Sequence, residues 1–378
     1  MTSIDFVSNP FTGGGPRNIY TLSGILNKSG YNSSVRFFNE LSYRKGSNVL
    51  VEQFGVNVKE PSKILDVLNR TTSVSDNLRF SLLPVFLFQE YIGRVATLYS
   101  NNIPDAFVST FWQSVFPTEH VSRKRKKAHF YFVQADETGF SNNKTYKAMA
   151  EKTYKLNIPK LTHSKWVKEH LDVKYGGENE YIGMGINHES FKPRGKNKEA
   201  TVFTIARKER DKGFDIFVKA MNEVWKGRKD FKVVIAGNQK IIEAMRSDNL
   251  IHFPLDNIGW LHDDNELSKW YETSIFVNTG RFEALPMPPL EAMACGSSVV
   301  MTDMPGAREY AHDYENALLC PAGDFRSFAE KIDELLSSED LRSKISRAGI
   351  TTASKYTWEN VASRTVKFLR NHGLEVHQ

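Results

Sequence analysis

The stretch between residues 274 and 301 constrains the fold of this 378-residue chain more than any other. Ser274–Asn278 and Ser298–Met301 are short apolar runs, which predict two buried strands. Between them, the pair Pro288–Pro289 suits the first turn of a helix and a glycine suits the position after its last residue. A helix is therefore predicted over Leu290–Cys295. Strand, loop, helix and strand in this order are typical of an α/β sheet.

Two glutamates flank the loop and the start of the helix in this stretch. Glu283 follows the first predicted strand, and Glu291 lies near the amino end of the predicted helix. Ligands of open α/β sheets bind at the carboxyl ends of the strands, where helix amino termini converge. Carboxylates accept hydrogen bonds from sugar or ribose hydroxyls and are badly suited to contact phosphate. The pair therefore predicts a hydroxyl-binding site, with two merely solvated glutamates as the alternative.

The length and the composition, with 40% hydrophobic and 25% charged residues, predict two core-forming domains. No window of eighteen uninterrupted apolar residues occurs, and the amino terminus lacks a basic region followed by an apolar one. We therefore expect neither a membrane span nor a secretory signal, and we expect a cytoplasmic location. The two cysteines are too few for a zinc site built from thiolates.

Strands and helices alternate through the rest of the chain as well. Helix Asn18–Lys28 follows a first strand and a glycine-rich turn, and Thr201–Ile205 opens a second series of strands. Alternation of this kind implies parallel sheets covered by helices on both faces. The other predicted elements of the first half are the strands Ser3–Val7, Ser34–Phe38, Ala106–Ser109 and His129–Gln134 and the helix Ser81–Tyr99.

The apolar pattern weakens between Tyr175 and Glu199, where polar and basic residues predominate. This stretch is predicted to be the linker between the domains. We therefore expect one domain over residues 1–180 and a second over residues 181–356. An amphipathic helix is predicted to follow, over about residues 357–378.

The turn after the first strand contains three consecutive glycines, Gly13, Gly14 and Gly15. Glycines let the backbone approach a diphosphate closely, with N–H groups free to point at it. The spacing is not that of the dinucleotide-binding fingerprint, and no acidic residue ends the second strand at the expected place. A phosphate-binding loop and an ordinary tight turn both fit this pattern.

Cations follow the first strand of the second half. Arg207 and Lys212 lie in a loop with five charges in seven residues, which by default would be a solvated loop. An arginine fork and a lysine point charge can also neutralise a diphosphate. Further along, Trp260 and Leu261 follow another predicted strand end, and Trp260 suits either a binding pocket or the core.

The only dense basic run is Arg123–Lys127, preceded by the aromatic stretch Phe111–Phe116. Such a run is usually a solvated loop. Basic and aromatic side chains together also suit an anionic membrane surface or a phosphorylated acceptor, and nucleic acid could use the same chemistry.

The segment Glu283–Gly296, continued by Asp303–Gly306 and Asn316–Pro321, resembles the donor-site signature of the family-4 retaining glycosyltransferases of GT-B fold. The resemblance implies an α/β chain with two Rossmann-like parallel-sheet domains that face a deep interdomain cleft. The first domain would serve the acceptor and the second would bind a nucleotide-sugar donor. The carboxyl-terminal helix would cross back onto the first domain.

The resemblance also implies roles for individual residues. Arg207 and Lys212 resemble the pyrophosphate-binding pair, Glu291 would hold the ribose hydroxyls, and Glu283 would hold a hydroxyl of the transferred sugar. The donor-binding residues implied in this way are Gly13, Gly14, Gly15, Arg207, Lys212, Leu261, Ala284, Leu285, Pro286, Met287 and Glu291.

The chain departs from the family at the first-domain catalytic position. Many members carry a histidine after the strand that here leads into Val108–Trp112, and this stretch has none. Asp136 and Glu137 resemble a Gln-Asp-x-Glu stretch of some polysaccharide-building members and are the predicted replacement, with a solvated loop as the alternative. His120, His129 and His163 are further candidates, although a lone histidine is more often structural.

The predicted function is therefore transfer of a sugar from a nucleotide-diphosphate donor, UDP- or GDP-linked, to a glycan, lipid-linked or other acceptor. Retention of anomeric configuration is implied by the resemblance. We expect no metal and no cofactor, since the chain has no Asp-x-Asp motif. Peripheral contact with the cytoplasmic face of a membrane would involve Arg123–Lys127. The alternatives are a nucleotide-sugar epimerase and a non-enzymatic basic protein that binds nucleic acid or membranes.

Overall fold

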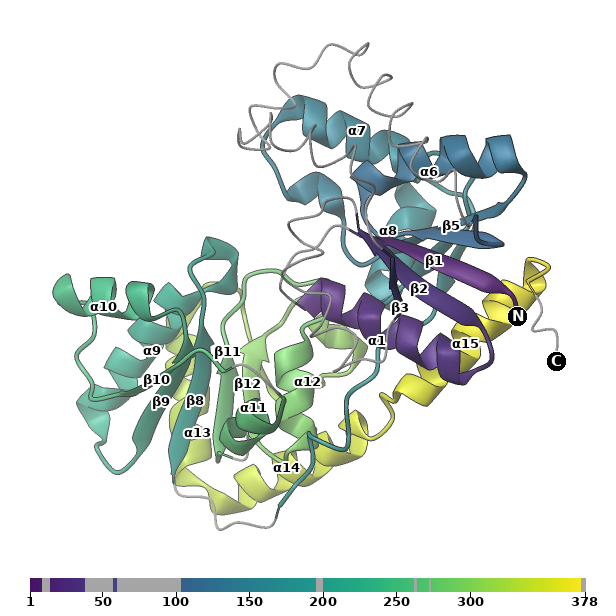
Figure 1. Cartoon of the computed structure of the whole chain (residues 1–378). Helices are drawn as coiled ribbons and strands as arrows, with labels where there is room; N and C mark the ends of the chain where they lie inside the picture. Colours follow the sequence, from purple (N-terminus) through teal and green to yellow (C-terminus); the bar gives the residue numbers. More distant parts are fainter. Residues whose placement is uncertain are drawn as a thin grey trace. The chain divides into compact units, whose positions relative to one another are not determined.

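Buried apolar strands alternate with helices along the chain, and they form two separate parallel sheets in a computed structural model (Figure 1). The structure describes residues 1–8, 14–37, 57–59, 103–194, 200–261, 264–271 and 273–374. The chain divides into unit 1, Met1–Met184 with Trp358–Gln378, and unit 2, Gly185–Thr357. The division after residue 184 rather than 180 reflects the burial of Ile182 in the core of unit 1.

Unit 1 is built on a seven-stranded sheet in the order β3-β2-β1-β4-β5-β6-β7, with every neighbouring pair parallel. Helix α1 packs against α15, and apolar residues of both helices share one core with β1, β4 and β5. The strands are β1 Ser3–Ser8, β2 Asn32–Phe37, β3 Asn57–Lys59, β4 Ala106–Ser109, β5 Ala128–Val133, β6 Lys160–Thr162 and β7 Asn179–Tyr181. The helices are α1 Gly14–Lys28, α6 Trp112–Arg125, α7 Lys144–Tyr154, α8 Lys165–Lys174 and α15 Trp358–Asn371.

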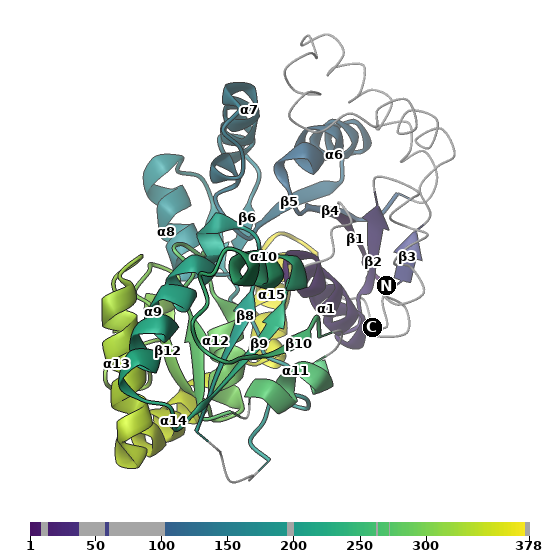
Figure 2. The ribbon, with the colours of Figure 1, turned by 90° about the vertical axis from the view of Figure 1, so that its left-hand side faces the viewer.

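Unit 2 is built on a six-stranded parallel sheet in the order β10-β9-β8-β11-β12-β13. Helix α9 packs against α13, and α11 packs against α12 (Figure 2). The strands are β8 Thr201–Ala206, β9 Lys232–Gly237, β10 Asp256–Gly259, β11 Ile275–Asn278, β12 Ser298–Thr302 and β13 Leu318–Cys320. The helices are α9 Phe214–Gly227, α10 Gln239–Ser247, α11 Asp264–Tyr271, α12 Met287–Ala294, α13 Phe325–Ser337 and α14 Glu339–Ala353.

The sequence order of unit 2 reverses direction at β8, its first strand. β8 lies between β9 and β11, so the chain runs outward to β10 and then returns to the other side of β8. Ligands of open α/β sheets bind outside the carboxyl ends of the strands at such a switch point. The carboxyl ends of β8 and β11 are therefore the expected position of a ligand in unit 2.

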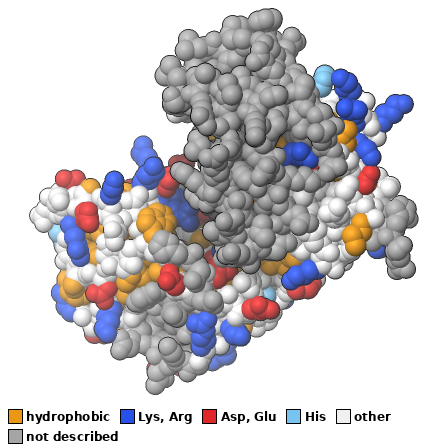
Figure 3. All heavy atoms as spheres, in the orientation of Figure 1, with side chains coloured by type: hydrophobic (Ala, Val, Ile, Leu, Met, Phe, Trp, Pro, Cys, Tyr) orange, Lys and Arg blue, Asp and Glu red, His pale blue; other side chains and the backbone are white. Residues whose placement is uncertain are grey.

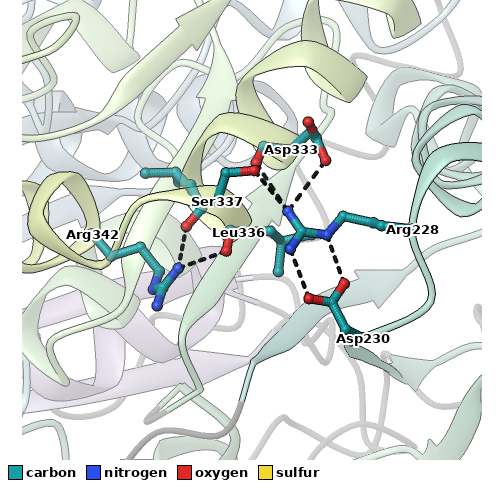
Figure 4. A network of polar contacts seen from close by, with 7 residues as sticks. Arg228, Asp230, Asp333, Leu336, Ser337 and Arg342 are labelled. Carbon is teal, nitrogen blue, oxygen red and sulfur yellow. Dashed lines mark hydrogen bonds and ion pairs between the residues drawn. The ribbon is translucent and has the colours of Figure 1, made fainter.

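An arginine network connects the end of α9 to α13 and α14 in unit 2 (Figure 4). The Arg228 guanidinium donates to both carboxylate oxygens of Asp230, at 2.7 and 2.8 Å, and to the Ser337 hydroxyl at 2.8 Å. Arg342 donates to the Leu336 carbonyl at 3.0 Å. These contacts lie near the surface, so they orient the helices while the apolar core supplies most of the stability.

Several predicted elements differ in extent from the structure, and helix α1 starts at Gly14, four residues before its predicted start. Helix α12 starts at Met287, three residues before the predicted start, because prolines are accepted within the first turn of a helix. Strand β5 runs from Ala128 to Val133, one residue earlier than predicted. The predicted helix 81–99 lies outside the described residues. None of the described helices is long and apolar enough to cross a membrane.

Candidate functional site

Glu283 and Lys212 meet at the carboxyl edge of the unit 2 sheet. Lys212 lies in the loop after β8, Glu283 lies in the loop after β11, and the Lys212 Nζ is 2.7 Å from the Glu283 Oε2. The Asn278 amide donates to the other carboxylate oxygen at 3.3 Å. Both side chains of the ion pair are partly exposed, so a ligand can reach them.

A glycine brings these two loops together. Gly213, directly after Lys212, has a φ of +67°, and a Cβ at this position would lie 1.9 Å from the Thr279 carbonyl oxygen. The Thr279 hydroxyl donates to the Gly213 carbonyl at 2.8 Å. Only glycine fits such an approach without displacing the backbone. The position of Lys212 therefore depends on the small residue that follows it.

Glu291, in α12, is 8% exposed and accepts a hydrogen bond from the Tyr271 hydroxyl at 3.3 Å. Burial and the nearby Glu291 carboxylate raise the pKa of Tyr271 well above its ordinary value, whereas the charge of Arg207 lowers it. Arg207 and Glu291 thus act on the same buried tyrosine. A ribose hydroxyl at this position would meet an acceptor carboxylate beside a fixed hydroxyl group.

Tyr310 is buried within the electrostatic influence of both glutamates. Burial raises its pKa well above the ordinary value, and the charges of Glu283 and Glu291 both add to this increase. Its hydroxyl donates to the Pro286 carbonyl at 2.6 Å. The loop between the glutamates is further held by Gly306, where a Cβ would lie 2.4 Å from two loop carbonyls.

The amino end of α12 offers few main-chain donors. Its N-cap residue is Pro286, and Pro288 and Pro289 follow Met287 in the first turn. Proline has no N–H, so Met287 has the only main-chain N–H between the N-cap Pro286 and Pro289. An anion at this edge therefore depends mainly on Arg207 and Lys212 for its stabilisation.

The remaining donor-side predictions lie around the same loop and the end of β10. Ala284 and Leu285 are buried, and Leu261 is half-buried. Trp260 is 52% exposed, so the interpretation of Trp260 as a core residue is wrong. An exposed indole ring directly after a strand end is suited to stacking on a flat ligand group.

In unit 1, the glycine-rich turn leads into α1, which begins at Gly14; Gly13 lies outside the described residues. A Cβ at Gly15 would lie 3.7 Å from the Gln134 amide, whose atoms are its three nearest neighbours. The Asn18 Nδ2 donates to the Gln134 Oε1 at 3.1 Å. Gln134, which follows β5, was not among the predicted site residues, because a single amide before an acidic pair gives no separate signal in the sequence.

The predicted catalytic carboxylates Asp136 and Glu137 make structural contacts. Glu137 is 5% exposed and accepts hydrogen bonds from the Tyr131 hydroxyl at 2.6 Å and the Trp112 N–H at 2.8 Å. Burial raises the pKa of Glu137 to about 7. Asp136 caps a short 3₁₀ turn through Thr138 and lies 2.9 Å from the His170 Nε2. These contacts favour a structural role, and the catalytic role stays a prediction.

The three histidine candidates differ in their surroundings. His129 is buried between the Ser109 hydroxyl at 2.8 Å and Glu119 at 2.9 Å, so both ring nitrogens have structural partners. His163 follows β6, and burial lowers its pKa to about 4, so the imidazole is neutral at pH 7. His120 is exposed on α6.

The basic run forms the last turn of α6 and the residues after it. Residues 123–126 are exposed, and basic side chains gather where α6 ends (Figure 3). Cations at a helix carboxyl end are favoured by the helix dipole, which is a structural reason for this cluster. The aromatic flank differs from the expectation, because Trp112 is 0% exposed and therefore cannot contact a membrane surface.

No group of three or more His, Cys, Asp or Glu side chains is arranged to hold a metal ion within the part of the chain that the structure describes. The two cations Arg207 and Lys212 and the two carboxylates Glu283 and Glu291 come from two loops and a helix at the unit 2 edge. Together they can bind a ligand that carries both anionic and hydroxyl groups.

The part of the chain that contains this sheet edge is similar to known proteins. Residues 186–352 match the protein-family model described as Glycosyl transferases group 1. The uncharacterized glycosyltransferase MJ1178 of Methanocaldococcus jannaschii is 28% identical over 200 residues, which cover 52% of this chain and 54% of that protein. The O-antigen biosynthesis protein RfbC of Myxococcus xanthus is 26% identical over 279 residues, which cover 71% of this chain and 21% of that protein. The matches thus span about half, or less, of the length of these relatives.

Solved structures resemble the whole chain. Sucrose-phosphate synthase of Thermosynechococcus elongatus has a TM-score of 0.80 at 14% identity, with 99% of both chains covered. Anabaena HepE, solved in complex with UDP-glucose, has a TM-score of 0.78 at 14% identity, with 98% of this chain and 100% of that chain covered. These similarities confirm the expected two-domain α/β fold of GT-B type.

Proposed function

We propose that the protein is a glycosyltransferase that moves a sugar from a nucleotide-diphosphate donor to a glycan, lipid-linked or other acceptor. The observation that carries the proposal is the group formed by Arg207, Lys212, Glu283 and Glu291 at the switch point of unit 2. This unit is also the part that matches the Glycosyl transferases group 1 model. Cations and hydroxyl acceptors on one sheet edge suit the diphosphate and the two sugars of such a donor.

The reaction breaks the bond between the anomeric carbon and the diphosphate oxygen and forms a bond from that carbon to an acceptor oxygen. The acceptor hydroxyl loses its proton, and a nucleoside diphosphate leaves. Negative charge develops on the departing diphosphate, so preorganised cations lower the barrier. Lys212 and Arg207 supply this charge, and the proposal includes no metal ion.

Each glutamate has a distinct role in the proposal. Glu291 accepts hydrogen bonds from the ribose hydroxyls beside the Tyr271 hydroxyl. Glu283 accepts a hydrogen bond from a hydroxyl of the transferred sugar. Its ion pair with Lys212 fixes the position of the sugar-binding carboxylate relative to the phosphate-binding ammonium group. The sugar is transferred with retention of configuration, and Trp260 with the backbone at Leu261 borders the nucleobase.

The acceptor side of the proposal concerns unit 1. RfbC, a relative of this chain, is named as an O-antigen biosynthesis protein, which supports polysaccharide or glycoconjugate synthesis. The exposed cations of residues 123–126 are suited to a phosphorylated acceptor or to the anionic surface of the cytoplasmic face of a membrane.

The proposal is tested by measuring nucleoside diphosphate release from a panel of sugar nucleotides, beginning with UDP-glucose, with and without a chelator. Lys212→Ala and Glu291→Ala are each expected to lower kcat by about 100-fold or more, because each removes a charge or acceptor preorganised for the donor. Lys226→Ala removes an exposed lysine of α9 and serves as the matched control, with unchanged turnover.

Other outcomes would contradict the proposal. Turnover that survives both Lys212→Ala and Glu291→Ala would show that the site is elsewhere. Conversion of the donor to a different sugar nucleotide without an acceptor would identify an epimerase. Salt-dependent DNA binding with no thermal shift from any nucleotide would favour a non-enzymatic binder.

A further inference from the structure

Gln134 has an unusual position at the carboxyl edge of the unit 1 sheet. It is the first residue after β5, and its side chain is half-buried. Gly15 lies in the first turn of α1, and a Cβ added to it would lie 3.7 Å from the Gln134 amide. Residues more than a hundred positions apart in sequence therefore meet at this amide.

Asn18 holds one end of the Gln134 side chain. Its Nδ2 donates to the Gln134 Oε1 at 3.1 Å, and both side chains are partly buried. This bond uses the carbonyl oxygen of Gln134, so the amide nitrogen is directed away from Asn18. The side chain is thereby held in one orientation before any ligand binds, which reduces the entropy lost on binding.

The Gln134 Nε2 makes no hydrogen bond within the described part of the chain. A primary amide nitrogen carries two N–H donors and no negative charge. Such a group is suited to the lone pairs of a sugar hydroxyl or ring oxygen. By contrast, the carboxylates that follow it, Asp136 and Glu137, accept hydrogen bonds from the protein itself.

We infer that Gln134 is a sugar-binding side chain of unit 1, which donates hydrogen bonds from Nε2 to the oxygens of a substrate sugar. Asn18 is its positioning residue, and Gly15, a residue of α1 that faces the amide, adds no side chain over it. The inference rests on the proposed glycosyltransferase function. It assigns to Gln134 the first-domain role for which Asp136 and Glu137 were the predicted candidates.

The test compares wild type with Gln134→Glu, Gln134→Ala and Asn18→Asp in the sugar-nucleotide turnover assay. Gln134→Glu keeps the shape but replaces two donors by an acceptor, so kcat/KM is expected to fall about 100-fold, and Gln134→Ala about 10-fold. Asn18→Asp, which also keeps its shape, can no longer donate to Oε1 and is expected to lower kcat/KM by about 10-fold. Asn371→Ala, an exposed amide in α15, serves as the control with unchanged turnover.

A second measurement separates sugar binding from a structural role. The nucleoside diphosphate product has no sugar to transfer, so its inhibition constant is expected to be the same in wild type and in all Gln134 variants. Unchanged kcat/KM in Gln134→Glu would overturn the inference while leaving the proposed function intact. Weaker inhibition by the product in parallel with lost turnover would also overturn it, since the defect would then be structural. A wild-type protein without turnover on the panel would overturn the proposed function and this inference with it.

Discussion

At the scale of single residues, the predicted catalytic carboxylate Glu137 is buried and makes structural contacts. One of its carboxylate oxygens accepts a hydrogen bond from α6 and the other accepts one from β5. The sequence shows two acidic residues after a strand, a pattern equally suited to a ligand site or a loop. The sequence could not show that a tyrosine hydroxyl and a main-chain N–H would enclose one of them.

The raised pKa of Glu137 predicts a pH dependence of stability. The folded state holds this proton up to about pH 7, whereas the unfolded chain releases it near the ordinary value of 4.5. The folded state therefore binds more protons between these values, so this contribution to stability is fully present below about pH 4.5 and is lost as the pH rises through 7. Glu137→Gln does not titrate, so the stability of this variant is expected to lack this dependence on pH.

Chemical denaturation at a series of pH values between 4.5 and 8 measures the effect. His163 acts in the opposite direction, because its lowered pKa removes stability as the pH falls. The difference between wild type and variant isolates the contribution of Glu137. Glu169→Gln, an exposed residue of α8, is the control, and equal slopes in wild type and Glu137→Gln would refute the assignment.

At the scale of elements, the loops after β8 and β11 act as one structure because Gly213 touches Thr279. A helix start with a glycine was predictable from the run Lys212-Gly213 ahead of an apolar helix. The contact with a loop more than sixty residues later was not, because it depends on β8 and β11 being neighbours in the sheet.

Gly213→Ala is expected to destabilise the protein by about 1–3 kcal/mol, because it adds a Cβ where the backbone is closest and where φ is positive. The loops must then separate, and the distance between the Lys212 ammonium and the Glu283 carboxylate is expected to increase. Gly227→Ala, at the other end of α9, has no atom within 4 Å of the added Cβ and is the matched control. Thermal unfolding and nucleoside diphosphate release measure both effects. A loss of stability with full turnover would show that the loop contact does not position Lys212.

At the scale of the whole molecule, each unit has its own hydrophobic core, and the two cores share no residue among those described. The alternation of strands and helices made two parallel sheets predictable. The prediction of a linker over residues 175–199 is wrong in its first part, because strand β7 of the unit 1 sheet lies within it. The boundary itself was displaced by four residues, since Ile182 packs with unit 1.

Separate cores predict that a nucleotide stabilises unit 2 in particular. At a nucleoside diphosphate concentration of 100 times Kd, ligand binding stabilises a folded unit by about 2.7 kcal/mol. Hydrogen exchange is expected to slow most in the loops after β8 and β11 and in α12, where the proposed ligands of the diphosphate and ribose lie. Lys212→Ala is expected to reduce this protection. Protection confined to unit 1 would contradict the placement of the donor site.

Local periodicity and turn residues by themselves determined the class of fold and the approximate positions of the strands, because these depend on residues that are near one another in the sequence. The tertiary structure alone decided which distant groups meet: Lys212 with Glu283, 71 positions apart, and Asn18 with Gln134, 116 positions apart. The order of strands in a sheet, which no local pattern encodes, brings such strand ends together. The order of strands therefore also decides which polar side chains keep a hydrogen-bond donor for a ligand and which form hydrogen bonds with one another.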